Sequence, residues 1–481
     1  MTRAVFGTKS KSEKIYKNLK SVLLFLCIIL YDECIRNIHE IRKRAERGYG
    51  NFNFTKERKS IKMETKTKKG YGKGWLLILY AFLGYFTATA VGSAMNAASG
   101  ILADLRGWNA AVLISLISAG SIANIVAGFV LGKLSAKYSA KKLSIICFVI
   151  YVAVMLGLGA TGNFMIFAVC LILANGISSG IGYQLSPVLI SRWFPKRKGI
   201  IMGIVTMGIP LCSGVATMIY QAGYAALGSV GGFLPFIIIA VIAAVILIVF
   251  LADNPADKNF TPDNGLDVKD AKEDVINHDS IWTTSKLLRT PQVWIHGVTL
   301  GLQLLFASGL MVQLFPRLLE IGFDPKTAGM MMLASGLLAL PGSYLCGVID
   351  SKIGARKAAY TSYIFGVIAM LTNLTGTTAG VWISLVCIGM VVGGAANWPA
   401  SLCIEEFGDS FANGYGVIQP IIQLVGAIGP VFFAAFYGIT GSYRIPYICG
   451  AVLMVIGLIC FKLLAKPGFV KAEEEKYQAD K

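Results

Sequence analysis

The chain has 481 residues, of which 55% are hydrophobic and only 15% charged, and its mean hydropathy is +0.65. This composition excludes an ordinary soluble protein of two or three domains. The net charge of +18 does not indicate a nucleic-acid partner, because the lysines and arginines gather in the N-terminal segment and in particular loops. In those places they orient membrane helices.

Residues 1–72 form a segment unlike the rest of the chain. An apolar run at 21–31 is too short to cross a bilayer, and Asp32 and Glu33 follow it directly. The remainder is basic and irregular, so we interpret 1–72 as a basic cytoplasmic tail. A second interpretation stays open, in which residues 1–62 are an over-extended start and Met63 is the native initiator.

From residue 75 onward, uniformly apolar runs recur at the length that crosses a hydrocarbon core of ~30 Å as a helix. Backbone polar groups in lipid need internal partners, and the runs do not alternate as barrel strands do, so we expect helices. The expected spans of the first set are 75–99, 110–131, 143–161, 164–190, 199–222 and 231–251. Those of the second set are 293–315, 328–349, 358–376, 380–403, 411–438 and 447–464.

A polar stretch rich in Asp, Lys, Asn and Pro separates the two sets. The predicted fold is therefore an all-α polytopic membrane protein, with twelve transmembrane helices in two pseudo-symmetric six-helix bundles. The expected boundaries are an N-terminal bundle at 73–252, a cytoplasmic linker at 253–291, a C-terminal bundle at 292–466 and a cytoplasmic tail at 467–481.

A short basic segment between the second and third spans returns between the eighth and ninth. The first copy runs from 132 to 142, and the second, 215 residues further on, runs from 347 to 357. Two such segments in register indicate a duplicated transporter body, with the substrate site near the midplane between the halves. The matching pairs are Gly132 with Gly347, Lys137 with Lys352, Lys141 with Arg356, and Lys142 with Lys357.

The charge of alternate loops predicts the orientation. Loops that carry several lysines and arginines alternate with loops that are nearly bare of them. Since basic loops stay in the cytoplasm, both termini and the linker are expected there. We expect a multi-pass protein of the plasma (inner) membrane, in contact with the lipid bilayer and monomeric.

On these residues the chain resembles the major facilitator superfamily, whose signature between its second and third helices reads roughly G-x-L-x-D-K/R-x-G-x-K/R-K/R. The first copy departs from that signature at Ala136 and Ser139, and in the second copy the acidic residue stands one place early. In the family this loop is thought to stabilise one end state of alternating access. The positions that the resemblance assigns to the gating and topology motif are Gly132, Lys137, Lys141, Lys142, Gly347, Asp350, Lys352, Gly354, Arg356 and Lys357. The alternative is that the basic residues are only topological anchors.

Two further stretches narrow the resemblance. The run 180–184 (GIGYQ), followed by 191–199 (SRWFPKRKG), is similar to the monocarboxylate and oxalate–formate antiporter branches. The oxalate–formate exchangers hold a dicarboxylate with an Arg in helix eight and a Lys in helix eleven. Here the run 328–349 has no basic residue, and uncharged Ile422 stands where the Lys would be. Dicarboxylate exchange is therefore not expected.

Ionisable groups are nearly absent from the expected spans, where they are costly and usually functional. This favours a neutral or weakly charged substrate, or recognition by aromatic groups, amides and helix dipoles. For each mid-span polar residue the alternative is an interhelical hydrogen bond. The candidate substrate-binding residues are Tyr85, Tyr183, Gln184, His296, Gln303, Asn397, Trp398, Gln419 and Gln423.

No catalytic constellation converges at either membrane face, so an enzyme is not expected. The ten cysteines contain no CxxC pair, and the phosphate-binding GxxxxGK[ST] loop of ATP-driven transporters is missing. We expect no metal and no cofactor.

The predicted function is secondary active transport of a small organic solute, a monocarboxylate-like anion, with a proton or an exchanged anion as the coupled partner. The alternative is efflux of amphipathic drug-like compounds, suggested by the aromatic, uncharged interior.

Overall fold

The computed structural model describes residues 72–265 and 281–479, and the expected N-terminal tail lies outside this range apart from its last residue. Within these residues the regular structure is helical throughout. The helices of the first half are α2 (Trp75–Arg106), α3 (Ala110–Ser135), α4 (Ala140–Ala160), α5 (Phe164–Ser178), α6 (Leu185–Trp193), α7 (Lys198–Thr206) and α8 (Gly208–Phe250). Those of the second half are α10 (Pro291–Ile321), α11 (Pro325–Ile353), α12 (Ala355–Leu374), α13 (Thr378–Phe407), α14 (Phe411–Gly426), α15 (Gly429–Thr440) and α16 (Arg444–Leu463). Short α9 (Thr284–Arg289) and α17 (Phe469–Ala479) flank the second half.

The described helices make twelve passes. Nine stretches are long and apolar enough to cross a membrane, and two of them, Lys198–Phe250 and Thr378–Thr440, each hold two passes. In the first, the chain reverses at Gly228, where φ is +65°, and this brings Gly223 against Gly231. The twelfth pass is the more polar α12. The twelve-helix membrane fold predicted from the sequence is confirmed.

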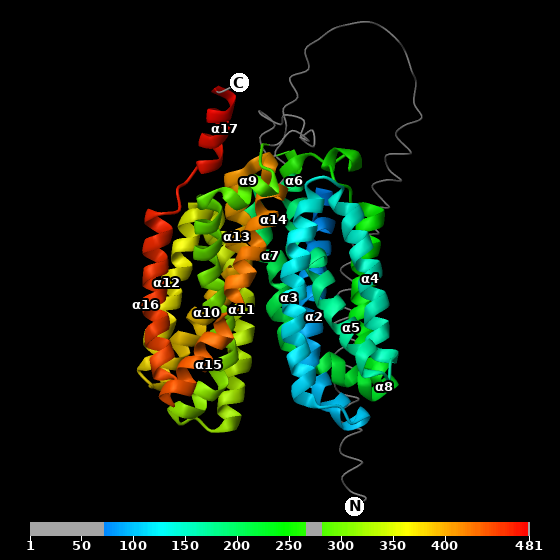
Figure 1. The fold of residues 1–481 in the computed structure, drawn as a ribbon, viewed down its shortest axis with the longest axis vertical. Helices are drawn as coiled ribbons and strands as arrows, with labels where there is room; N and C mark the ends of the chain where they lie inside the picture. The colour runs from blue at the N-terminus through cyan, green and yellow to red at the C-terminus, as the bar shows by residue number, and fades with distance from the viewer. Residues whose placement is uncertain (1–71, 266–280, 480–481) are drawn as a thin grey trace, which may run out of the picture. The chain divides into compact units, whose positions relative to one another are not determined.

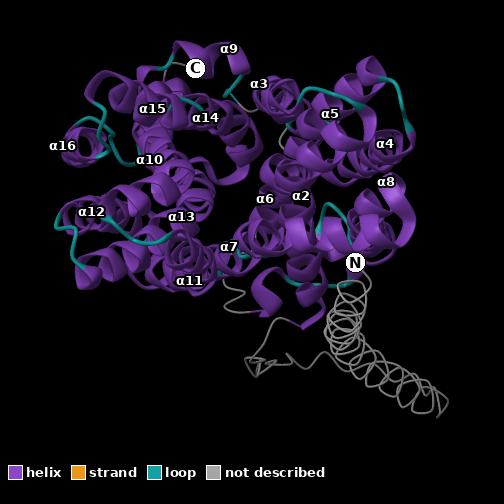
Figure 2. Ribbon diagram, turned by 90° about the horizontal axis from the view of Figure 1, so that it is seen from below, coloured by secondary structure: helices purple, strands orange, loops and turns teal. Residues whose placement is uncertain are grey.

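The passes form two groups. Figure 1 shows α2 to α8 gathered on one side and α10 to α16 on the other, with their axes roughly aligned. Figure 2, which looks along the helices, shows α7 beside α11, where the two groups meet. The halves contact each other through α3 with α14, and through α7 and α8 with α11, while α7 also contacts α13. We call the end that carries the residues around 135–140, 251–265, 281–290 and 464–479 the linker end, and the opposite end the far end.

Basic side chains repeat the same contact in each half at the linker end. The Lys141 ammonium donates to the carbonyls of Ile248 (2.9 Å) and Leu251 (2.6 Å), which end α8. In the second half Arg356 donates to the carbonyls of Phe461 (3.4 Å) and Ala465, at the end of α16. A cation at a helix C-terminus satisfies free carbonyls and the negative end of the dipole. The equivalence of Lys141 and Arg356 in sequence is therefore an equivalence of contacts.

The far end has a matching pair of caps. Arg106, at the end of α2, donates to the Gly159 carbonyl at 3.2 Å, where α4 ends. Arg317, near the end of α10, donates to the Asn373 carbonyl at 3.4 Å, where α12 ends. In each half, the third pass thus both supplies a cap at its start and receives one at its end. The two halves therefore resemble each other in their tertiary contacts as well as in their sequence motifs.

Candidate functional site

Three tyrosines come together where the two halves meet. The rings of Tyr85 on α2 and Tyr183 pack edge to face, with centroids 5.6 Å apart. Thr89 lies one turn after Tyr85, and its hydroxyl is 3.2 Å from the Tyr183 hydroxyl. Tyr415 on α14 of the other half lies within electrostatic range of both phenols and stacks on Phe411. We call Tyr85, Thr89, Tyr183 and Tyr415 the tyrosine cluster.

The helix that carries Tyr183 is irregular at that place. Ser179–Gln184 forms a π-helical segment between α5 and α6. Such segments are rare and occur frequently at functional sites, because the wider turn re-aims side chains. Tyr183 is partly exposed, whereas the phenol oxygen of Tyr85 is buried without a hydrogen-bond partner. The Tyr85 hydroxyl, buried beside a partly exposed ring, is therefore free to donate a hydrogen bond to a ligand.

Three other predicted substrate-binding residues face elsewhere. Gln303 donates to the Ala359 carbonyl of α12 at 3.2 Å, and Trp398 donates to the Cys346 carbonyl of α11 at 3.3 Å. His296 lies at the linker end, where Nδ1 is 2.8 Å from the Gln292 carbonyl and its ring lies 5.1 Å from that of Phe469. All three make contacts within the second half.

The remaining predicted substrate-binding residues are amides. Gln184 follows Tyr183 in the chain and is buried, and its Oε1 has no partner. Gln419 is buried and Gln423 partly exposed, one turn apart on α14, the helix that contacts α3 of the other half. Asn397 is fully buried on α13, and neither its Nδ2 nor its Oδ1 has a partner.

Two of the motif glycines, Gly132 and Gly347, lie at the contact between the halves. A Cβ on Gly132 of α3 would collide with the backbone of Gly416 on α14. A Cβ on Gly347 of α11 would come within 2.9 Å of Gly203 Cα on α7. Gly132 and Gly347 therefore each pack their backbone directly on a glycine of the opposite half, an approach that any side chain prevents. Both contacts lie toward the linker end of their helices.

Polar side chains add to the second of these contacts. Ser343 of α11 donates to the Gly203 carbonyl at 2.9 Å, and its hydroxyl lies 2.7 Å from that of Thr206. Lys198 at the start of α7 pairs with Glu405 of α13 at 3.7 Å. The Asp350 side chain is buried against Gly199 of α7. The halves are thus held together at the linker end by polar as well as backbone contacts.

The other motif residues act locally or face outward. Gly354 takes φ +85° and ends α11, with its N–H bonded to the Asp350 carbonyl at 2.8 Å. The exposed motif lysines are Lys137, Lys142, Lys352 and Lys357. The exposed positions fit the role of topological anchors.

The expectation that charged groups are nearly absent from the spans was wrong. Helix α10 continues through Pro316 to Ile321, and Arg317 within it is buried, paired with Glu320 at 2.8 Å. Asp350 likewise lies within α11 and is 3% exposed. The spans predicted from hydropathy, 293–315 and 328–349, end before the helices do. A charged residue after an apolar run lowers the local hydropathy as a loop would, even where the helix continues.

The start of the linker is anchored to the first half. Asp263 accepts hydrogen bonds from the N–H groups of Lys196 (2.8 Å) and Arg197 (3.0 Å), just before α7. Burial raises the pKa of the Asp263 carboxyl above its ordinary value, although these two donors lower it. The loop that precedes α7 is therefore held by a residue that is distant in sequence.

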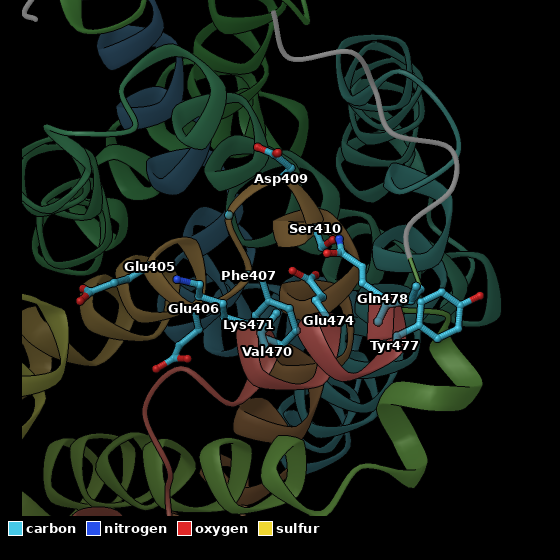
Figure 3. A pocket seen from close by; sticks show the side chains of 12 residues that line it. Glu405, Glu406, Phe407, Asp409, Ser410, Val470, Lys471, Glu474, Tyr477 and Gln478 are labelled. Atoms are coloured by element: carbon cyan, nitrogen blue, oxygen red, sulfur yellow. The ribbon is translucent and has the colours of Figure 1, made fainter. Parts of the chain in front are cut away.

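A hollow of about 470 Å³ lies at the linker end of the second half (Figure 3). Its walls come from the end of α13 and from α17, and they carry Glu405, Glu406, Asp409 and Glu474. Trp282, just before α9, donates a hydrogen bond to Glu474 of α17 at 2.8 Å. This bond connects α17 to the segment that follows the linker. This hollow lies apart from the tyrosine cluster.

The sequence profile described as Major Facilitator Superfamily matches residues 81–430. The chain belongs to the Major Facilitator Superfamily. Its fold and family make it a multi-pass membrane transporter rather than an enzyme.

Individual relatives within the superfamily are distant. An uncharacterized transporter, YycB of Bacillus subtilis (strain 168), is 23% identical over 292 residues, which are 59% of this chain and 66% of that protein. The oxalate:formate antiporter of Oxalobacter formigenes is 25% identical over 317 residues, 61% of this chain and 69% of that protein. Among solved structures, the proton:xylose symporter XylE has a TM-score of 0.61 at 15% identity, covering 82% of this chain and 95% of its own.

The structure adds one site residue that the sequence did not indicate. Tyr415 was not among the predicted substrate-binding residues. Its sole sequence signal is its place four residues after Phe411, near the start of an expected span. That spacing puts two aromatic rings on one helix face but does not show which face.

Proposed function

We propose that this protein is a secondary transporter that moves a small monocarboxylate-like anion by alternating access between its two halves. The observation that carries the proposal is the tyrosine cluster, which brings hydroxyl-bearing side chains of both halves into one region with the unpartnered Tyr85 oxygen. Phenol and threonine hydroxyls donate to a carboxylate without bringing in a buried cation. The name of the oxalate:formate antiporter, one of the distant relatives, points to the same class of substrate.

The contacts at the linker end supply the closed gate of such a cycle. Backbone–backbone contacts at Gly132 and Gly347 join the halves there. In the proposed cycle these contacts cut the substrate site off from that end. A transporter needs a second state in which these contacts separate. The ten motif residues thus divide into gate residues, helix caps and exposed anchors.

We place the linker end on the cytoplasmic side of the inner membrane, because the exposed lysines of both motif copies lie at that end. A biotinylating reagent that does not cross membranes should fail to label Lys137 and Lys352 in whole cells and should label both in inverted vesicles. Labelling of these lysines in intact cells would reverse the orientation.

Replacing Tyr85 by phenylalanine should weaken carboxylate binding while leaving the fold intact. A hydrogen bond to a charged group contributes about 1.5–3 kcal/mol, so the KM for the anion should rise roughly ten- to a hundredfold. The measurement is exchange of radiolabelled formate, lactate or pyruvate in proteoliposomes that contain the purified chain. Tyr344→Phe is the control, because that ring is 43% exposed on the surface of α11.

The same assay separates the second candidate function. Efflux of amphipathic compounds would draw on the aromatic walls of the cluster rather than on its hydroxyls. In that case Tyr85→Phe would leave flux nearly unchanged, whereas replacing the ring with alanine would remove it. Exchange of none of the three carboxylates by the wild-type chain would refute the carboxylate proposal.

A further inference from the structure

Arg106 occupies, at the far end of the first half, the place that Arg317 occupies in the second. Each arginine stands near the end of the first helix of its half, and each donates to a carbonyl where the third pass ends. The guanidinium carbon lies 4.9 Å from the centre of the Trp108 ring in the first half and 5.6 Å from that of Tyr447 in the second. The two halves therefore build similar surroundings for one arginine.

The two arginines differ in their counterion. Arg317 pairs with Glu320 at 2.8 Å, and Glu320 also accepts a hydrogen bond from the Tyr443 N–H at 3.1 Å, in the turn between α15 and α16. A resident carboxylate thus joins the arginine to that turn. Among the residues that the structure describes, no carboxylate pairs with Arg106. Asn109 stands three residues after it, as Glu320 follows Arg317.

Two polar groups of the first half are buried beside this charge without a partner. Arg106 Nη1 makes no hydrogen bond, although Nη2 donates to the Gly159 carbonyl. The hydroxyl of Tyr220 on α8 likewise has no partner, and its ring stacks on that of Tyr224 with centroids 6.4 Å apart. Both phenols lie within electrostatic range of the guanidinium. Since buried donors are rarely left unpaired, a cation with free donors nearby favours an anionic acceptor.

The acceptor can come from outside the chain. Arg106 and Tyr224 are both partly exposed, and the chain reverses just beyond Tyr224, at Gly228. This reversal is the first-half counterpart of the turn that Glu320 joins to Arg317. A carboxylate bound at Arg106 would therefore repeat the contact that the second half makes with its own side chain.

We propose that Arg106 and Tyr220 form a second anion site, the Arg106 site, which binds the carboxylate of the transported solute at the far end. The inference rests on the proposed transport function. The guanidinium supplies charge-assisted hydrogen bonds, and the Tyr220 hydroxyl supplies one more. Its positive charge also attracts anions from solution, which the uncharged tyrosine cluster does not do. The Arg106 site thus collects the solute that the tyrosine cluster then binds.

Chemical modification of arginines in the purified full chain, read by peptide mass spectrometry, tests binding without transport. Phenylglyoxal should modify Arg106, and pyruvate should protect it relative to chloride at the same ionic strength. Arg444, exposed at the same end, is the control and should react equally with and without pyruvate. Modification of Arg106 that pyruvate leaves unchanged overturns the proposal. Protection by the anionic lipid phosphatidylglycerol but not by pyruvate also overturns it, because the site then holds a lipid headgroup.

Phenylalanine at Tyr220 removes one donor and keeps the contact of Arg106 with α4. The pyruvate concentration that gives half-maximal protection should rise about tenfold or more, as expected for one lost hydrogen bond to a charged group. Tyr447→Phe is the matched control, because its buried hydroxyl also lacks a partner but its arginine already has Glu320. An equal rise in both variants overturns the role of Tyr220. If phenylglyoxal does not reach Arg106, the KM for pyruvate exchange in proteoliposomes decides, with a rise expected in Tyr220→Phe alone.

The tyrosine cluster has to be separated from the Arg106 site. Protection of Arg106 should persist in Tyr85→Phe at the pyruvate concentration that protects the wild-type protein. Protection lost in that variant would show that pyruvate acts through the tyrosine cluster, which overturns the second site. Absence of carboxylate exchange in the wild-type protein would instead refute the proposed transport function, while protection of Arg106 would still establish the anion site.

Discussion

Valine in place of Gly347 should abolish transport, whereas valine at Gly336 on the same helix should be tolerated. A Cβ at Gly347 would lie 2.5 Å from the Gly199 carbonyl oxygen and 2.9 Å from Gly203 Cα, both backbone atoms of the opposite half. At Gly336 a Cβ would meet no heavy atom within 4 Å. Both substitutions change the helix propensity of α11 equally, so the difference between them isolates the contact between the halves.

The expected size follows from the cost of overpacking. Forcing extra methyl groups into a close-packed contact costs typically 1–3 kcal/mol, which shifts the balance between closed and open linker end by about five- to 150-fold. Spin labels carried by unnatural amino acids at Tyr138 and Lys352, one exposed position in each half, should report a longer distance in Gly347→Val. An unchanged distance together with normal exchange would show that the contact is not a gate.

The duplicated motif extends the same reasoning to the first half. Gly132 packs on Gly416 as Gly347 packs on Gly203, so Gly132→Val should lengthen the distance in the same direction. The first copy lacks an acidic residue at Ala136, whereas the second copy adds Asp350 to its contact. Both copies thus make the same kind of glycine–glycine backbone contact with the opposite half. Only the second copy adds a charged side chain, Asp350, to that contact.

Sequence reasoning reached the fold because the physical signals are repeated and strong. Apolar runs of membrane length occur twelve times, and the motif pairs Lys141 with Arg356 in register. The structure confirms the twelve helices and gives Lys141 and Arg356 equivalent helix-capping contacts. Hydropathy cannot separate a capping lysine from an exposed one, so Lys141 and Lys137 were indistinguishable before the structure.

The candidate site was only partly accessible from the sequence. Polarity in mid-span identified Tyr85 and Tyr183, which the structure brings together, but it equally selected Gln303 and Trp398, which bond within the second half. The direction in which a side chain points depends on how each helix is rotated. In an apolar helix buried on several sides, hydrophobic periodicity does not reveal that rotation. Tyr415 was missed for the same reason.

Removing the buried arginine of the far end should cause the largest loss of stability. Arg317 Nε donates to Asn373 Oδ1 at 2.9 Å, Nη1 pairs with Glu320 at 2.8 Å, and the guanidinium lies 5.6 Å from the centre of the Tyr447 ring. Arg317→Met keeps much of the apolar stem but strands the Asn373 amide, which is fully buried, and leaves the Glu320 carboxylate without its cation. Breaking a buried pair by removing one partner costs about 3–5 kcal/mol, and the half-exposed position of Glu320 moves the expected value toward the lower limit.

The matched control is Arg444→Met, since Arg444 is exposed at the same end of the second half. Thermal unfolding of both variants in detergent, followed by loss of the monodisperse peak, should show a clear fall in midpoint for Arg317→Met and almost none for Arg444→Met. The double variant Arg317→Met with Glu320→Gln should recover part of the loss, because the unpaired carboxylate is then removed. Equal midpoints for the two single variants would mean that the cap on α12 contributes nothing to stability. In that case the repeat of Arg106 in Arg317 would be a trace of duplication rather than a selected contact.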